Sequence, residues 1–195
     1  MNNDSAHVLH NIIEFRVNIY AAQKMRPGGS WFPLLPKRIQ ETKAVINPKN
    51  KDDRCFLYAV YLGLLDLSKI TQCARVSQIR KGVIDQKVIV NCSLPMPVEP
   101  IPANFRKFEA DNPHIHLNVY GTLDDEARSP VTSLHVRYNK DKDAKVVNIL
   151  FTRNEEGKGH YSFIKNMSHL MHNVTKSHKK KQVCPHCVNT YFNSE

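Results

Sequence analysis

The chain has 195 residues, of which 41% are hydrophobic and 24% are charged, so it can bury a core and is not a disordered protein. No stretch approaches the roughly 18 consecutive apolar residues of a membrane span. Residues 1–5 have neither the basic start nor the apolar run of a secretory signal. We therefore expect a protein of the cell interior, in the nucleus or the cytoplasm, that does not bind membranes.

The first half of the chain is predicted to be mainly helical. Its longest apolar run begins at Cys55, and because apolar residues lie on all its sides, we expect a helix packed on several faces. Asp52 or Asp53 is the expected N-cap of this helix. The other expected elements are, in chain order, an extended segment at 11–20, a loop at 27–30, a proline-broken stretch at 31–36, a short helix at 37–43, a strand at 44–47, a helix at 67–81, a strand at 88–90, a proline-rich connector at 94–100 and a helix that starts at Pro102 and ends at Asn112.

The second half is predicted to consist mainly of strands, because apolar residues alternate with polar ones between charged or glycine-containing turns. The expected strands are 115–119, 131–138, 145–151 and 160–164, and a helix at 168–175 follows with Ser168 as its N-cap. Helices that precede an antiparallel sheet indicate the α+β class. We expect one α+β domain over residues 1–178 and a basic tail over residues 179–195.

Cys55 is the first candidate for chemistry. In the first turn of a helix, a thiol lies at the positive end of the helix dipole, which favours the nucleophilic thiolate. The alternative is that Cys55 is a small buried apolar residue, as many free cysteines are.

A cysteine nucleophile needs a base, and the base needs a group that orients it. Among the ten histidines, His160 is the best candidate for the base, because it opens a predicted strand directly after a glycine-rich turn. Asn166 is the candidate orienting residue. Asp52 or Asn50 could help to form an oxyanion hole, through a side chain or the neighbouring backbone N–H groups.

The order of a helix with cysteine followed by a sheet with His-Tyr resembles the architecture of papain-like cysteine peptidases. Asp52-Asp53-Arg54-Cys55-Phe56 and His160-Tyr161 are similar to the Asp-Gly-Asn-Cys and His-Tyr blocks of ovarian-tumour-type deubiquitinases. That family has a glycine where Asp53 stands, and its third catalytic member falls on Ser162. The resemblance implies a papain-like fold and a protein substrate that could be ubiquitin-like.

A second resemblance covers more of the chain, from about Phe15 to Phe192. Two blocks carry most of it, at residues 43–56 and 160–168, and shorter blocks lie at 29–32, 35–36 and 75–77. These blocks resemble the module that precedes the DNA polymerase in Polinton/Maverick-type mobile elements and related viruses. The resemblance implies a mobile-element or viral origin, and in that family a zinc finger opening with Cys-x-x-Cys follows the module.

Cys184-Pro185-His186-Cys187 has the spacing with which two thiolates hold one Zn²⁺ ion. The odd cysteine count also fits metal-binding or reactive thiols better than a disulfide framework. A complete site needs two further ligands, and His172 or His178, a partner, or residues of a longer finger could supply them. The alternative is a tail without metal.

The net charge of +10 is concentrated near the C-terminus, where residues 157–194 include no acidic residue. Such a basic end indicates a polyanionic partner, most simply nucleic acid, and its alternative is a solvated basic surface or a nuclear-import signal. The candidate nucleic-acid-binding residues are Lys176, Lys179, Lys180 and Lys181. The sequence thus supports two functions: a thiol hydrolase of the cysteine-peptidase type, active or inactive, that uses Cys55, His160 and Asn166, and a non-catalytic nucleic-acid-binding or DNA-polymerase accessory module.

Overall fold

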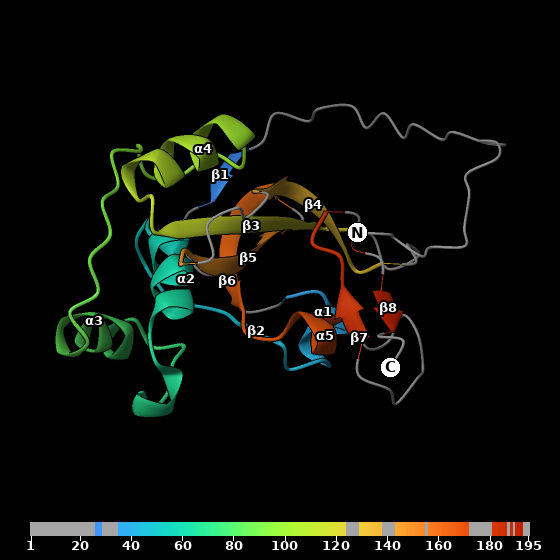
Figure 1. Cartoon of the computed structure of the whole chain (residues 1–195), viewed down its shortest axis with the longest axis horizontal. Coiled ribbons are helices and arrows are strands. Elements are labelled where there is room, and N and C mark those ends of the chain that lie inside the picture. The colour runs from blue at the N-terminus through green and yellow to red at the C-terminus, as the bar shows by residue number, and fades with distance from the viewer. Residues whose placement is uncertain are drawn as a thin grey trace, which may run out of the picture.

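The computed structural model describes residues 26–28, 35–123, 129–137, 143–154, 156–171, 181–186, 188 and 190–192. The expected segment at 11–20 and most of the stretch at 31–36 lie outside these residues. The described part has the α+β class that the sequence predicts, with helices on a twisted sheet (Figure 1).

The main sheet has six strands in the order β1-β6-β5-β3-β4, with β2 also paired to β6. Its strands are β1 (Arg26–Gly28), β2 (Val45–Ile46), β3 (Ile115–Thr122), β4 (Val131–Val136), β5 (Lys145–Arg153) and β6 (Lys158–Ile164). The sheet is mixed rather than antiparallel, because β3 pairs in parallel with β5 and β1 with β6. Antiparallel β4 returns the chain to the end of the sheet where β3 begins, so β5, on the other side of β3, runs parallel to it.

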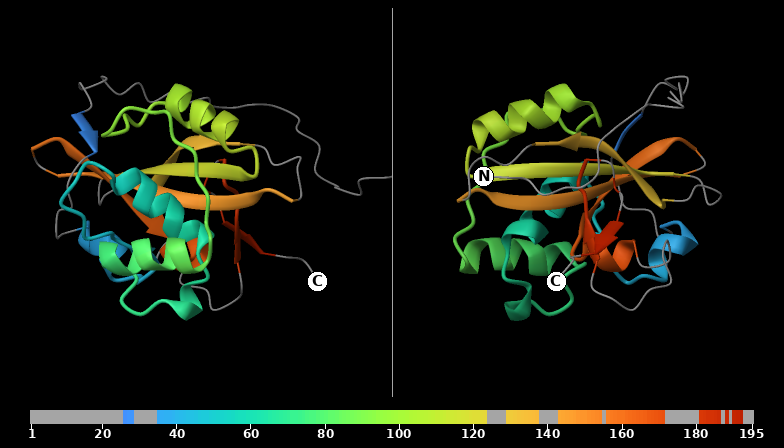
Figure 2. Two further views of the ribbon diagram at one scale, coloured as in Figure 1. Left: turned by 90° about the vertical axis from the view of Figure 1, so that its left-hand side faces the viewer. Right: turned by 45° about the vertical axis from the view of Figure 1, so that its right-hand side comes forward.

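Two helices, α2 (Cys55–Leu64) and α4 (Pro102–Asp111), cover one face of this sheet, and α3 (Val76–Asp85) packs against α2 (Figures 1 and 2). Phe56 of α2 lies at the centre of this face, where its ring packs edge-on against Phe108 and Tyr161 at centroid separations of 5.2 and 5.3 Å. The all-round apolarity of α2 is explained by its position, because it packs on the sheet on one side and on α3 on another.

The other face is covered by α1 (Lys37–Gln40), α5 (Met167–Leu170) and a hairpin of β7 (Lys181–Val183) and β8 (Thr190–Phe192). The buried residues of this second cluster include Ile39, Leu150, Leu170 and Val188. The hydroxyl of Ser133 on β4 donates to the carbonyl of Pro185 at 2.6 Å. The hairpin of β7 and β8 is therefore attached to the main sheet through β4.

Two predicted elements differ from the structure between α2 and α4. Residues 67–69 form a short 3-10 helix, η1, and α3 begins only at Val76. The predicted strand at 88–90 is not a strand. Lys87 adopts a left-handed backbone with φ of 52°, and the N–H of Val88 bonds to the carbonyl of Val83, so this segment ends α3.

Candidate active site at the start of the central helix

Cys55 is the first residue of α2 and is fully buried. The residue that precedes the helix is Arg54, which makes no side-chain cap, so the predicted capping by Asp52 or Asp53 is not observed. Asp52 instead accepts a hydrogen bond from the N–H of Arg54 at 3.2 Å, one residue before the helix starts.

The environment of the Cys55 thiol opposes the expected activation. The pKa of the thiol is raised from 9.0 to about 12, mainly by burial and to a smaller extent by the charges of Asp52 and Asp53. Backbone hydrogen bonds from Tyr161 and Phe56 lower the pKa without offsetting burial. In this conformation the thiol is protonated at neutral pH, because desolvation of a thiolate outweighs the helix dipole.

His160 lies on β6 and is fully buried. Its Nε2 is 2.7 Å from Oδ1 of Asn47, the residue that follows β2. Because an amide oxygen only accepts, Nε2 carries the proton in a neutral ring, and Nδ1 is then the basic nitrogen. Tyr161, whose backbone bonds to the Cys55 sulfur, is the next residue along β6. The Cys55 sulfur therefore lies beside the β6 backbone one residue after His160, and the His160 ring lies beside Asn47.

Asn166, the predicted orienting residue, is engaged elsewhere. It precedes α5, and its Oδ1 accepts from the N–H of His169 at 2.9 Å, so it caps that helix. Asn166 follows His160 by six residues, and six residues of extended chain span roughly 20 Å, so the two residues are far apart along β6. Antiparallel pairing of Ile46 with Phe163 instead brings Asn47 beside the histidine. The sequence alone did not identify Asn47, although its position as the last residue of the predicted strand at 44–47 was a usable signal.

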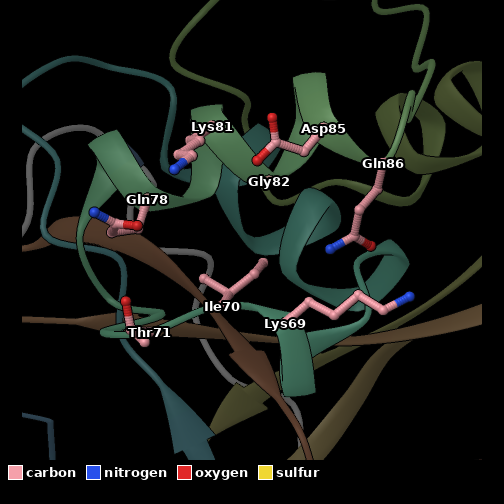
Figure 3. A pocket seen from close by; sticks show the side chains of 8 residues that line it. All are labelled: Lys69, Ile70, Thr71, Gln78, Lys81, Gly82, Asp85 and Gln86. Atoms are coloured by element: carbon pink, nitrogen blue, oxygen red, sulfur yellow. The ribbon is translucent and has the colours of Figure 1, made fainter.

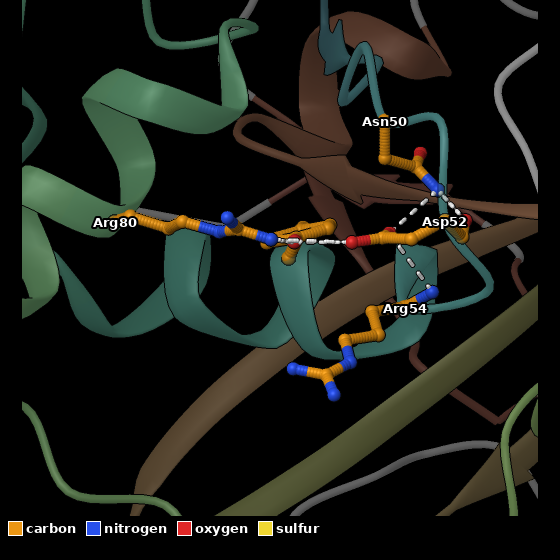
Figure 4. Close-up of polar contacts among 5 residues, drawn as sticks. Asn50, Asp52, Arg54 and Arg80 are labelled. Atoms are coloured by element: carbon orange, nitrogen blue, oxygen red, sulfur yellow. Dashed lines mark hydrogen bonds and ion pairs between the residues drawn. The ribbon is translucent and has the colours of Figure 1, made fainter.

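Asp52, the second predicted partner of Cys55, is held by a network from α2 and α3 (Figure 4). Its Oδ2 accepts from the hydroxyl of Tyr58 at 2.8 Å and from Arg80 at 3.2 Å, and Arg80 also donates to the Tyr58 oxygen at 2.6 Å. The amide of Asn50 donates to the backbone and side chain of Asp52. The carboxylate is a hydrogen-bond acceptor that fixes the loop 47–54 and offers no donor to an oxyanion.

Ser162 stands where the ovarian-tumour-type pattern has its third member. Its hydroxyl is buried and has no hydrogen-bond partner among the residues that the structure describes. It therefore makes no hydrogen bond to the His160 ring, whose Nε2 contacts Asn47 instead.

Two surface pockets lie beside the loop 47–54. Asn47 lines a pocket of about 700 Å³ and Asp52 an adjoining one of about 470 Å³. A third pocket of about 560 Å³ lies between η1 and α3, where Lys81 and Asp85 of α3 face Lys69 and Ile70 (Figure 3). None of the predicted site residues lines this third pocket.

The predicted zinc knuckle is only partly described. The N–H of Val188 bonds to the carbonyl of Cys184 at 2.9 Å, and Val188 has a φ of 58°, so the chain makes a tight turn between β7 and β8. Cys187, His172, His178, Lys176, Lys179 and Lys180 lie outside the described residues, and Lys181 belongs to β7. Within the described ranges, no three His, Cys, Asp or Glu side chains are grouped to hold a metal ion.

No protein-family model, curated protein or solved structure matches this chain. In the part of the chain that the structure describes, no helix has the length and apolar character needed to span a membrane.

Proposed function

We propose that the chain is a thiol hydrolase of the papain-like cysteine-peptidase type, with Cys55 as nucleophile, His160 as general base and Asn47 as the residue that orients the imidazole. One observation carries the proposal. The Cys55 sulfur bonds to the β6 backbone next to His160, while the His160 ring is held by Asn47 at 2.7 Å. A cysteine nucleophile, a histidine base and an asparagine that orients the base are a combination used for cysteine-dependent acyl transfer.

The raised pKa of Cys55 sets the mode of activation. A thiol whose pKa is about 12 does not supply a preformed thiolate at neutral pH. It must lose its proton to a base as it attacks, as a serine hydroxyl does. In the proposed step, the sulfur forms a bond to the substrate carbonyl carbon while Nδ1 of His160 takes the thiol proton, and the protonated ring then donates to the leaving amine.

The substrate is proposed to be an amide or isopeptide of a protein, ubiquitin-like or part of a viral or mobile-element polyprotein. The loop 47–54 must move for such a substrate to reach the buried sulfur. This origin and the papain-like fold rest on the sequence resemblance, carried by residues 43–56 and 160–168.

The proposal is tested with probes that carry an electrophile in place of the scissile carbonyl. The full chain is treated with a ubiquitin vinyl ester and with a peptide fluoromethyl ketone, and adducts are located by mass spectrometry. We expect adducts at Cys55 and none in Cys55→Ala. Labelling should slow at acid pH, because a protonated imidazole cannot accept the thiol proton.

Asn47→Ala and Asn166→Ala form a matched pair of variants for this assay. Loss of the orienting amide should slow Cys55 labelling by about 10- to 100-fold, because a misplaced base loses its alignment. Asn166→Ala removes only a helix cap and should leave the rate unchanged. Absence of a Cys55 adduct with both probes, while iodoacetamide still modifies Cys73, would end the hydrolase proposal.

The alternative function, a non-catalytic nucleic-acid-binding or DNA-polymerase accessory module, is favoured by the full burial of Cys55. In that case the thiol is part of the core, and the function depends on a basic surface. Failure of the labelling experiment supports this alternative.

A further inference from the structure

Two adjoining surface pockets form a basic groove along the loop that precedes Cys55. The pockets share two lining residues, Lys49 and Arg75, so they lie next to each other. The cationic residues that line them are Lys49, Lys51, Arg75, Arg80 and Lys165, and these five residues define the basic groove.

The groove has a strong excess of positive charge. Asp52 is the single acidic residue among those that line the two pockets. Its carboxylate is already engaged by Arg80 and Tyr58. Cations gathered in one hollow raise the local concentration of anions and attract a polyanionic ligand.

The walls of the groove are fixed relative to one another. The N–H of Lys49 donates to the carbonyl of Ala74 at 2.8 Å, which joins the loop before α2 to the segment before α3. Gln72 has a φ of 54°, and its carbonyl accepts from the N–H of Arg75 at 2.8 Å, so this segment makes a defined turn. Arg80 is anchored by Tyr58. Cations on a fixed backbone lose less conformational entropy when they bind a ligand.

We propose that the basic groove binds the sugar–phosphate backbone of a nucleic acid. Arginine guanidinium groups and lysine ammonium groups along two adjoining pockets suit a ligand with one negative charge per repeating unit. The two pockets have no aromatic lining residue on which a base could stack. Binding is therefore independent of sequence, because phosphate contacts position a nucleic acid without reading its bases.

This groove is distinct from the basic end of the chain, which is where the sequence alone places nucleic-acid contacts. Its cations come from the loop before α2, from α3 and its start, and from the end of β6. The inference does not depend on hydrolase activity, and it gives the alternative function a binding site on the folded body.

The test measures the salt dependence of binding. A fluorescently labelled single-stranded oligonucleotide and a duplex of the same sequence are titrated with the full chain between about 50 and 200 mM salt, and the dissociation constant is obtained from anisotropy. Each phosphate contact contributes about −0.7 to the slope of log K against log salt for a single strand and about −0.9 for a duplex.

The variant Lys49→Ala/Arg75→Ala removes the two cations that both pockets share. We expect the slope to become shallower by about 1.4 on the single strand or about 1.8 on the duplex, with weaker binding of both. Both side chains are exposed, so the circular dichroism spectrum and urea midpoint should be unchanged.

Lys81→Ala/Arg106→Ala is the matched control, because it removes the same charge from exposed positions outside the basic groove. Both double variants lower the net charge from +10 to +8. If the two double variants change the salt-dependence slope equally, the basic groove is not the binding site. The same conclusion follows if the slope changes only in Lys179→Ala/Lys180→Ala/Lys181→Ala. Displacement of the oligonucleotide by polyglutamate at the same charge concentration overturns the choice of nucleic acid as ligand.

Discussion

The burial of Cys55 makes the stability of the fold sensitive to alkaline pH. The folded thiol has a pKa of about 12, whereas an exposed thiol in the unfolded chain has a pKa near 9.0. Between these values the unfolded chain loses the proton and the folded chain keeps it. The folded state then binds more protons, so the free energy of unfolding falls as pH rises above about 9.

The size of this effect follows from the two pKa values. Near pH 8 both states keep the proton and the loss is negligible. At pH 10 the unfolded thiol is mostly ionised, which lowers the free energy of unfolding by about 1.4 kcal/mol, one pH unit of linkage. Burial also raises the pKa values of Tyr120, Tyr161 and Cys92, which add their own losses by pH 10, so the contribution of Cys55 is the difference between the wild type and a variant without this thiol.

Urea denaturation of the wild type and of Cys55→Ala at about pH 8 and pH 10 isolates this contribution. Cys55→Ala is less stable at both pH values because it leaves a small cavity. Its loss between the two pH values should be smaller than that of the wild type by about 1.4 kcal/mol. An identical pH dependence for the two proteins would mean that Cys55 titrates normally in the folded state, and the argument from burial would be wrong.

Two further predictions concern the packing of the helices on the sheet. Gly63 on α2 faces Val147 and Phe163, which leave no room for a β-carbon. Gly63→Ala should therefore lower the free energy of unfolding by about 1–3 kcal/mol. An unchanged urea midpoint would contradict this prediction. Glu109 on α4 is 1% exposed, and its carboxylate accepts from the N–H of Leu117 at 2.9 Å and lies 3.1 Å from Nε2 of His135. Glu109→Ala removes the carboxylate from both groups and should lower the free energy of unfolding, measured by urea denaturation, by about 3 kcal/mol. Glu109→Gln keeps the bond to Leu117 and should lower it by less. Equal small losses of stability in the two variants would contradict this prediction.

The position of α2 could be predicted from the sequence because its pattern is unusual. A polar loop that ends abruptly in an apolar run allows few alternatives to a helix, and Cys55 lies in the first turn of that helix as expected. The alternation within β3 and β5 likewise identified strands that are buried in the structure. These features depend on local periodicity, which is visible in one sequence.

Pairing between distant segments could not be predicted in the same way. Asn47 contacts His160 only because β2 pairs with β6, and a two-residue strand carries too little pattern to show its partner. The segment 88–90 has the composition of a strand, but the side-chain amide of Asn112 bonds to both the backbone N–H and the carbonyl of Asn91, where a strand partner would otherwise be needed. Tertiary contacts of this kind override propensity.

The loop 47–54 connects the two proposals. Asn47 at the start of the loop contacts His160 and lines one of the two groove pockets, and Lys49 and Lys51 of the same loop line the groove as well. Arg80 belongs to both systems, because it lines the groove and pairs with Asp52 at 3.2 Å. A phosphate that binds Arg80 competes with the Asp52 carboxylate for the same guanidinium. Binding of a phosphate in the groove therefore weakens the hydrogen bonds between Arg80 and Asp52 that help to fix the loop before Cys55. By linkage, movement of this loop releases Arg80 and favours binding of an anion.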